Sequence, residues 1–307
     1  ANSKHLSRSE VNVKNRTVQG PQARCGCTVS TVPRPRRSVS VLRDGDGSVE
    51  MGHEVAKIAA ISCTHSPHTP SETHQWILDT IANTKGLTHF VHCGDVFDAQ
   101  AASVHPDEAD HTLMDEYRHA ASFLKSIRQS LPDGCRLAIC EVNHDDNIRR
   151  ADPRRIPKGL RETALWMNTE YAEEFKRWHW RPYIKSAAGC YRVGQVVFYH
   201  GFDCGLTSDE LEGLQMNNQT GCHPYRLFVR GHTHRPVPPT QMMRTRKVSL
   251  PWWYMNVGTC GPLKPDYMTR KDTGNWGSGL ALIEARMETA SRLNAKEWEA
   301  ELRTMPC

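Results

Sequence analysis

Residues 55–98 read VAKIAAISCTHSPHTPSETHQWILDTIANTKGLTHFVHCGDVFD, and this stretch decides the fold. It opens with an apolar run at 55–61, which is typical of a buried strand. Apolar residues then recur with helical spacing, so a helix is expected from near Ser71 to Gly86. Residues 88–92 form the next predicted strand. This β-α-β order indicates a parallel sheet covered by helices.

The rest of the chain extends this pattern and then departs from it. A long amphipathic helix over 113–127 leads into a strand at 136–142, and a polar helical region is expected over about 159–178. Later strands are predicted at 191–193, 196–200, 227–230, 252–257 and 280–285, with a final edge strand at 297–302. The sequence therefore predicts one α/β domain at 53–307, built from two facing mixed sheets flanked by helices.

Residues 1–52 have a different composition. Up to Glu50 they hold nine Lys and Arg against four Asp and Glu, with a PRPRR cluster at 33–37. Such a segment has too little apolar content to bury a core of its own. We expect an extended N-terminal arm that binds a protein partner, a second copy of the chain or nucleic acid.

The bulk composition limits the classes of protein. A net charge of +5 over 307 residues does not by itself imply a large nucleic-acid-binding face. No apolar run approaches the roughly 20 residues of a membrane helix, and the first residues do not resemble a signal peptide. The eleven cysteines are scattered and mostly lie in apolar runs, which favours a reducing compartment. These features predict a soluble cytoplasmic protein without a membrane partner.

Five short motifs carry the chemistry, and each directly follows a predicted strand. They are Cys63-Thr-His65, Gly94-Asp-Val-Phe-Asp98, Asn143-His-Asp145, His200-Gly201 and Gly231-His-Thr-His234. The carboxyl ends of parallel strands form one ligand-binding edge, so these residues can converge despite large sequence gaps. A single histidine after a strand is more often a packing residue, but five such motifs are a poor match to chance. The sequence therefore predicts a metal site.

The order of the motifs resembles that of the calcineurin-like metallophosphoesterases, whose pattern is D-x-H, G-D-x-x-D, G-N-H-D/E, a lone H and G-H-x-H. The resemblance covers about residues 55–285, and the sequence around the motifs is most similar to that of the phosphoesterases of bacteriophages and prophages. It implies the metallophosphoesterase sandwich fold and a hydrolase of phosphodiesters or phosphomonoesters. A phage origin would place the protein in the host cytoplasm or the virion.

The resemblance also implies a role for each site residue. Asp95 would bridge two divalent ions (Mn, Zn or Fe), with Cys63, His65 and His234 completing the first site and Asn143, His200 and His232 the second. The ions would activate a hydroxide between them for in-line attack. His144 would protonate or stabilise the leaving oxygen, and Asp98 would orient His144 by hydrogen bonding.

Two residues depart from the family pattern. Cys63 stands where the family has its first Asp, and Val142 stands where it has a Gly before Asn143. A thiolate suits zinc or ferrous iron better than manganese, so the first site is expected to prefer a softer metal. The alternative is an inert buried cysteine beside a weakened site. Val142 does not readily adopt the positive φ open to Gly, so the Asn143 loop is expected to follow a different path.

Two functions from different classes remain open at this stage. The first is the metal-dependent phosphoesterase, with nucleic acid, a nucleotide or a small phosphodiester as candidate substrates. The second is an assembly or virion-associated structural protein that keeps the phosphoesterase fold with reduced or no catalysis. Metal content and a turnover assay would separate them.

Overall fold

A computed structural model describes residues 55–102, 111–142, 144–145, 166–183, 189–219, 224–242, 251–265, 273–287 and 295–306. The predicted arm, the domain boundary near residue 52 and Asn143 lie outside these residues. The helices are α1 (Ser71–Ala82), α2 (Leu113–Ser130), α4 (Ala172–Phe175) and α5 (Ser208–Gln219), with short 3₁₀ turns at Gln100–Ala102 and Trp166–Asn168. The strands are β1 (Val55–Ile61), β2 (His89–His92), β3 (Arg136–Cys140), β4 (His179–Arg181), β5 (Tyr191–Val193), β6 (Val196–Phe198), β7 (Leu227–Arg230), β8 (Pro236–Met242), β9 (Trp252–Val257), β10 (Gly279–Arg286) and β11 (Trp298–Thr304).

The described strands form two mixed sheets. The first has the order β11-β10-β1-β2-β3-β4, in which β1 to β4 run parallel and β10 and β11 are antiparallel additions. The second has the order β5-β6-β7-β9-β8, with a parallel centre of β6, β7 and β9 and antiparallel strands at both edges. The fold prediction of two facing mixed sheets flanked by helices is confirmed.

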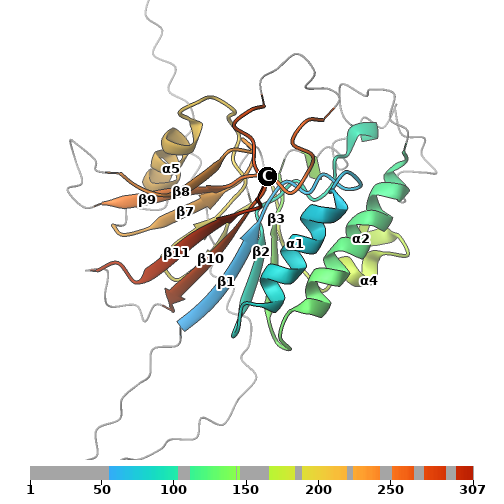
Figure 1. Cartoon of the computed structure of the whole chain (residues 1–307), viewed down its shortest axis with the longest axis horizontal. Coiled ribbons are helices and arrows are strands. Elements are labelled where there is room, and N and C mark those ends of the chain that lie inside the picture. The colour runs from blue at the N-terminus through green and yellow to red at the C-terminus, as the bar shows by residue number, and fades with distance from the viewer. Residues whose placement is uncertain are drawn as a thin grey trace, which may run out of the picture.

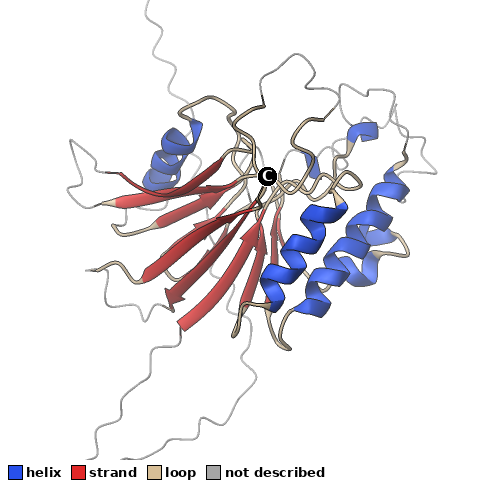
Figure 2. Ribbon diagram, viewed as in Figure 1, coloured by secondary structure: helices blue, strands red, loops and turns tan. Residues whose placement is uncertain are grey.

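The sheets face each other, and helices cover their outer faces (Figures 1 and 2). Alternation along β1 explains the layering, because successive side chains point to opposite faces of a sheet. Ile58 and Ala60 pack in the core between the two sheets. Ala59 and Ile61 pack in a second core beneath α1, α2 and α4. A smaller core beside α5 includes Phe228 and Trp252.

Several element bounds agree with the sequence patterns. The ranges expected at 55–61, 227–230 and 252–257 are those of β1, β7 and β9, and the predicted final edge strand is β11. The first helix ends at Ala82 instead of near Gly86, because Asn83 already caps it. The polar helical region appears, in its described part, as a 3₁₀ turn and the short α4.

The parallel strands bring five loops to one edge of the sandwich. β1, β2 and β3 end at the same edge of the first sheet, as β6 and β7 do in the second, and these ends meet near the centre of Figure 1. The described residues of the predicted motifs follow these strand ends. No helix within the described residues combines the length and hydropathy of a bilayer-spanning segment.

Candidate metal centre

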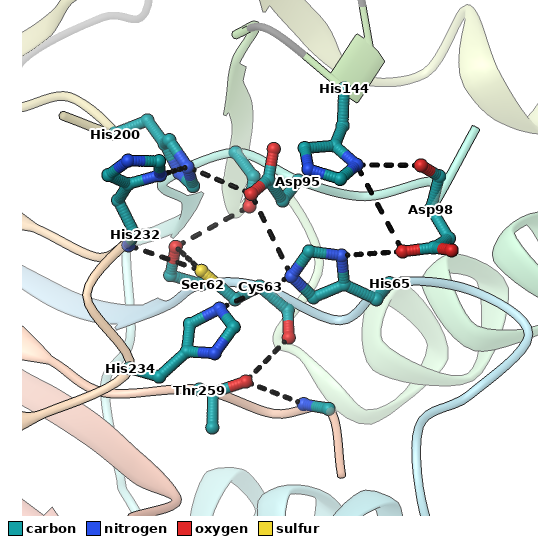
Figure 3. Close-up of polar contacts among 12 residues, drawn as sticks. Ser62, Cys63, His65, Asp95, Asp98, His144, His200, His232, His234 and Thr259 are labelled. Atoms are coloured by element: carbon teal, nitrogen blue, oxygen red, sulfur yellow. Dashed lines mark hydrogen bonds and ion pairs between the residues drawn. The ribbon is translucent and has the colours of Figure 1, made fainter. Parts of the chain in front are cut away.

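Ligand-type side chains from five strand ends converge in the structure (Figure 3). Three groups each bring three such atoms within 4.8 Å of one another, and they are Cys63 with His65 and His234, Cys63 with Asp95 and His200, and His65 with Asp95 and His144. His232 lies next to these groups, because its Nδ1 atom is 3.0 Å from Nε2 of His200. Six of the seven predicted ligands therefore lie together, and the seventh, Asn143, is outside the described residues.

The backbone at these residues is strained. Seven described residues other than glycine have positive φ, and five of them are predicted ligands: Cys63, His65, Asp95, His232 and His234. A left-handed conformation costs such residues about 1–2 kcal/mol each, and such strain clusters at functional sites. The turns at the strand ends therefore lower the stability of the fold in order to position these side chains, which is typical of a functional site.

In the first half of the site, hydrogen bonds define which nitrogen of His65 is available. Its Nδ1 donates to the Asp98 carboxylate at 3.1 Å, because an ionised carboxylate only accepts. In a neutral imidazole, Nε2 then holds a lone pair, and it lies 3.3 Å from His234 Nε2 and 3.7 Å from Asp95 Oδ2. A carboxylate that fixes the tautomer in this way is the usual partner of a metal-ligating histidine.

The second half repeats this arrangement with a carbonyl in place of the carboxylate. His200 Nδ1 donates to the Cys93 carbonyl at 3.0 Å. Its Nε2 lies 2.9 Å from Asp95 Oδ2 and 3.0 Å from His232 Nδ1. A carboxylate and two imidazole nitrogens thus lie within reach of one cation in this half of the site.

Burial sets the charge state of the ligand groups. Burial, followed by the charge of His200, lowers the pKa of His232 to about 3. Burial, followed by His65, holds the pKa of His234 well below its ordinary value. Both rings are therefore neutral near pH 7, which is the form that binds a metal.

The two anionic ligands differ from each other. Burial alone would raise the pKa of Asp95, but the imidazoles around it, His200 first, hold that pKa well below its usual range. Burial and the charge of Asp95 raise the pKa of Cys63 well above its ordinary value. Asp95 is thus an anion in the metal-free protein. Cys63 becomes a ligand only when an incoming cation displaces the proton from its thiol.

These residues fit divalent metal ions. Asp95 Oδ1 and His234 Nδ1 are buried atoms with no hydrogen-bond partner among the described residues, and such atoms are costly unless something binds them. The donor set of one thiol, one carboxylate and several imidazoles suits zinc or iron better than magnesium. The convergence predicted from the motifs is therefore present with chemistry that a metal would complete.

His144 and Asp98 lie side by side, but their contact differs from the expected one. His144 Nδ1 donates to the backbone carbonyl of Asp98 at 2.6 Å, and the Asp98 carboxylate is 4.0 Å from that nitrogen. The carboxylate instead pairs with His65. Asp98 therefore orients His144 through its backbone and His65 through its side chain.

The sequence patterns missed a buried polar network beneath the second half. Arg230, fully buried, lies 3.4 Å from the carboxylates of Asp209 and Glu212. Glu212 accepts from the backbone N–H groups of Phe202 and Asp203, which follow His200. Asn256 donates to Asp209 at 2.8 Å and to the Gly231 carbonyl at 2.9 Å. This network supports the turns that carry His200 and His232.

The loop after β9 supports Cys63 in the same manner. Thr259 Oγ1 and the Gly261 N–H donate to the Cys63 carbonyl at 3.0 and 2.8 Å. The signal that could have found this loop is the polar stretch Asn256-Val-Gly-Thr259 at the end of a parallel strand, the same placement as the five recognised motifs.

Gly201→Ala is expected to destabilise the protein by about 2–5 kcal/mol, the sum of an overpacking cost and a positive-φ backbone cost. Gly201 has a φ of +117°, and a Cβ built there would overlap the guanidinium of Arg230. Gly205→Ala is the matched control, because a Cβ at Gly205 meets nothing within 4 Å. Denaturant unfolding of the metal-free variants checks this. Equal stability of both variants would mean that the Arg230 side chain can move aside freely.

Two further residues lie beside the site. Cys204 Sγ is 3.2 Å from His232 Nε2, although no motif pointed to this thiol. His68 Nε2 lies 3.9 Å from Asp98 Oδ2, and His68 belongs to none of the three ligand groups.

Comparisons with known proteins add little to this geometry. No family model and no curated protein matches the chain. Among solved structures it is similar to Vps29 of Chaetomium thermophilum, with 13% identity and a TM-score of 0.35 over 82% of this chain and 96% of that one. It is also similar to a cold-active protein-tyrosine phosphatase of a psychrophilic Shewanella species, with 13% identity and a TM-score of 0.36 over 76% of this chain and 78% of that one. Similarities of this size are too weak to assign a function to this chain.

Proposed function

We propose that the protein is a metal-dependent phosphoesterase that uses two divalent ions. The observation that carries the proposal is the convergence of Cys63, His65, Asp95, His200 and His234 into overlapping ligand groups at one edge of the sandwich. Cys63, His65 and His234 would hold one ion, Asn143, His200 and His232 would hold the other, and Asp95 would be shared by both. When bound, two such ions supply a nucleophile at neutral pH and neutralise charge on the phosphate.

The residues around this site have roles that follow from their hydrogen bonds. His65 and His200 would bind the ions through Nε2, because the Asp98 carboxylate and the Cys93 carbonyl accept their Nδ1 protons. His144 keeps a proton on Nδ1 for the Asp98 carbonyl, so its Nε2 is the atom that can pass a proton to the leaving oxygen. In the metal-free protein, burial alone would lower the pKa of His144, but the charge of Asp95 and the hydrogen bond to the Asp98 carbonyl raise it.

Several finer assignments belong to the proposal. The substrate is a phosphodiester or phosphomonoester, with nucleic acid or a nucleotide as a candidate, and the ions are Mn, Zn or Fe. The amino-acid sequence in and around the motifs is what supports similarity to phage phosphoesterases. The rival role as an assembly component depends on residues 1–52, which lie outside the described structure, and the cytoplasmic or virion location likewise remains a prediction.

The test is reconstitution of the full chain. Protein stripped by a chelator should bind up to two divalent ions per chain and then hydrolyse a chromogenic phosphodiester, whereas the stripped protein should be inactive. Metal content is measured by elemental analysis and the fold by circular dichroism. A folded chain that binds no metal after reconstitution would contradict the proposal, and a chain that binds metal without turnover would favour the assembly role.

A further inference from the structure

The sulfur of Cys63 belongs to both halves of the candidate metal centre. One ligand group joins it to His65 and His234, and another joins it to Asp95 and His200. In each group the three ligand atoms lie within 4.8 Å of one another. A thiol has a single donor atom, so one atom is within reach of the ligands of both ions.

The sulfur is also held in place by its surroundings. The backbone N–H of His232 donates to Cys63 Sγ at 3.2 Å, and Ser62 Oγ lies 3.1 Å from it. Cys63 has a φ of +56°, and its carbonyl is anchored by Thr259 and Gly261. Its side chain is fully buried, so the sulfur does not turn away into solvent. These contacts fix the position of a buried, hydrogen-bonded sulfur between the ligand groups.

We propose that the Cys63 thiolate bridges the two metal ions, an inference that rests on the proposed dinuclear function. The resemblance to the family assigns the bridging role to Asp95 alone. A metal–sulfur bond of about 2.3 Å and an ion separation of about 3.5–4 Å require an angle at sulfur of about 100–120°, which a thiolate can adopt. Asp95 Oδ2 remains a second bridge, since it lies near both His200 and His65.

A bridging sulfur has consequences that a carboxylate at this position would not have. Each ion gains a soft ligand, so both sites, not the first alone, prefer zinc or ferrous iron to manganese. Each ion also stabilises the thiolate that the other needs, so the two ions should bind cooperatively.

The bridge is tested by X-ray absorption at the zinc edge on the full chain loaded with two zinc ions. A bridging thiolate gives on average one sulfur per zinc at about 2.3 Å, a terminal thiolate gives one sulfur per two zinc ions, and a non-ligating thiol gives none. Cys204 is a second thiol close to the site, so Cys204→Ser is the matched control. We expect one sulfur per zinc in the unmodified chain and in Cys204→Ser, and none in Cys63→Ser.

A second measurement covers the case in which Cys63→Ser fails to fold or to hold metal. In cobalt titrations of the unmodified chain and of Cys204→Ser, the thiolate-to-metal charge-transfer absorption should continue to rise until two equivalents of cobalt are bound. With a terminal thiolate, this absorption would stop rising after the first equivalent. One sulfur per two zinc ions, or sulfur scattering that survives in Cys63→Ser, overturns the bridge and leaves the phosphoesterase intact. Failure of the folded chain to bind zinc overturns both.

Discussion

Asp95→Asn is expected to lower phosphoester hydrolysis by more than about 100-fold and to reduce the metal content below two ions per chain. Loss of a group that merely supports a ligand costs about 10–100-fold in metal affinity or activity, and Asp95 is expected to contribute more, as a ligand. It is the one carboxylate in the described ligand groups, and its Oδ2 lies 2.9 Å from His200 Nε2. A neutral amide would remove the one carboxylate that the two ions would share.

Metal analysis and steady-state kinetics on the same preparations check this expectation. Asp79→Asn is the control, because Asp79 is an exposed residue of α1 away from the site, and the variant should match the unmodified chain. If Asp95→Asn retained two ions and full turnover, the assignment of Asp95 as a ligand between the two ions would be wrong.

His144→Ala is expected to lower turnover by about 100-fold or more while metal content stays unchanged. This is the size of effect expected when a positioned general acid is lost. The assignment needs testing because the structure also places His144 within 4.8 Å of the ligand atoms of His65 and Asp95. A ligand role would remove an ion, whereas an acid role would not.

The leaving group distinguishes these roles further. A general acid matters most when the departing oxygen is a strong base, so the loss should be larger for an alkyl phosphoester than for a nitrophenyl one. His119→Ala, at an exposed position of α2, is the control and should leave both rates unchanged. An equal loss for both substrates, together with loss of an ion, would make His144 a ligand.

Much of the fold was predictable because its central strands are buried on both faces. Such strands appear in sequence as mainly apolar runs, and this is why β1, β7 and β9 were predicted with their observed bounds. Two strands and one helix of the described residues were not predicted. β4 spans only three residues, which are too few to show a pattern. β8 holds three prolines, which argue against a strand, yet its place at the sheet edge tolerates them. α5 buries polar residues such as Asp209 and Glu212, so it lacks the apolar periodicity of a helix packed on a core.

The candidate site divides in the same way. The residue types and their order after the strands were visible in the sequence, and the parallel topology alone was enough to predict that they converge. Which atoms face each other was not predictable: the Asp98 carboxylate pairs with His65 instead of His144, and the Cys63 sulfur lies within reach of both halves. These contacts depend on left-handed turns at Cys63, His65 and Asp95 and on the packing of one sheet against the other. Both are set by contacts between residues far apart in the chain, so only the tertiary structure decides them.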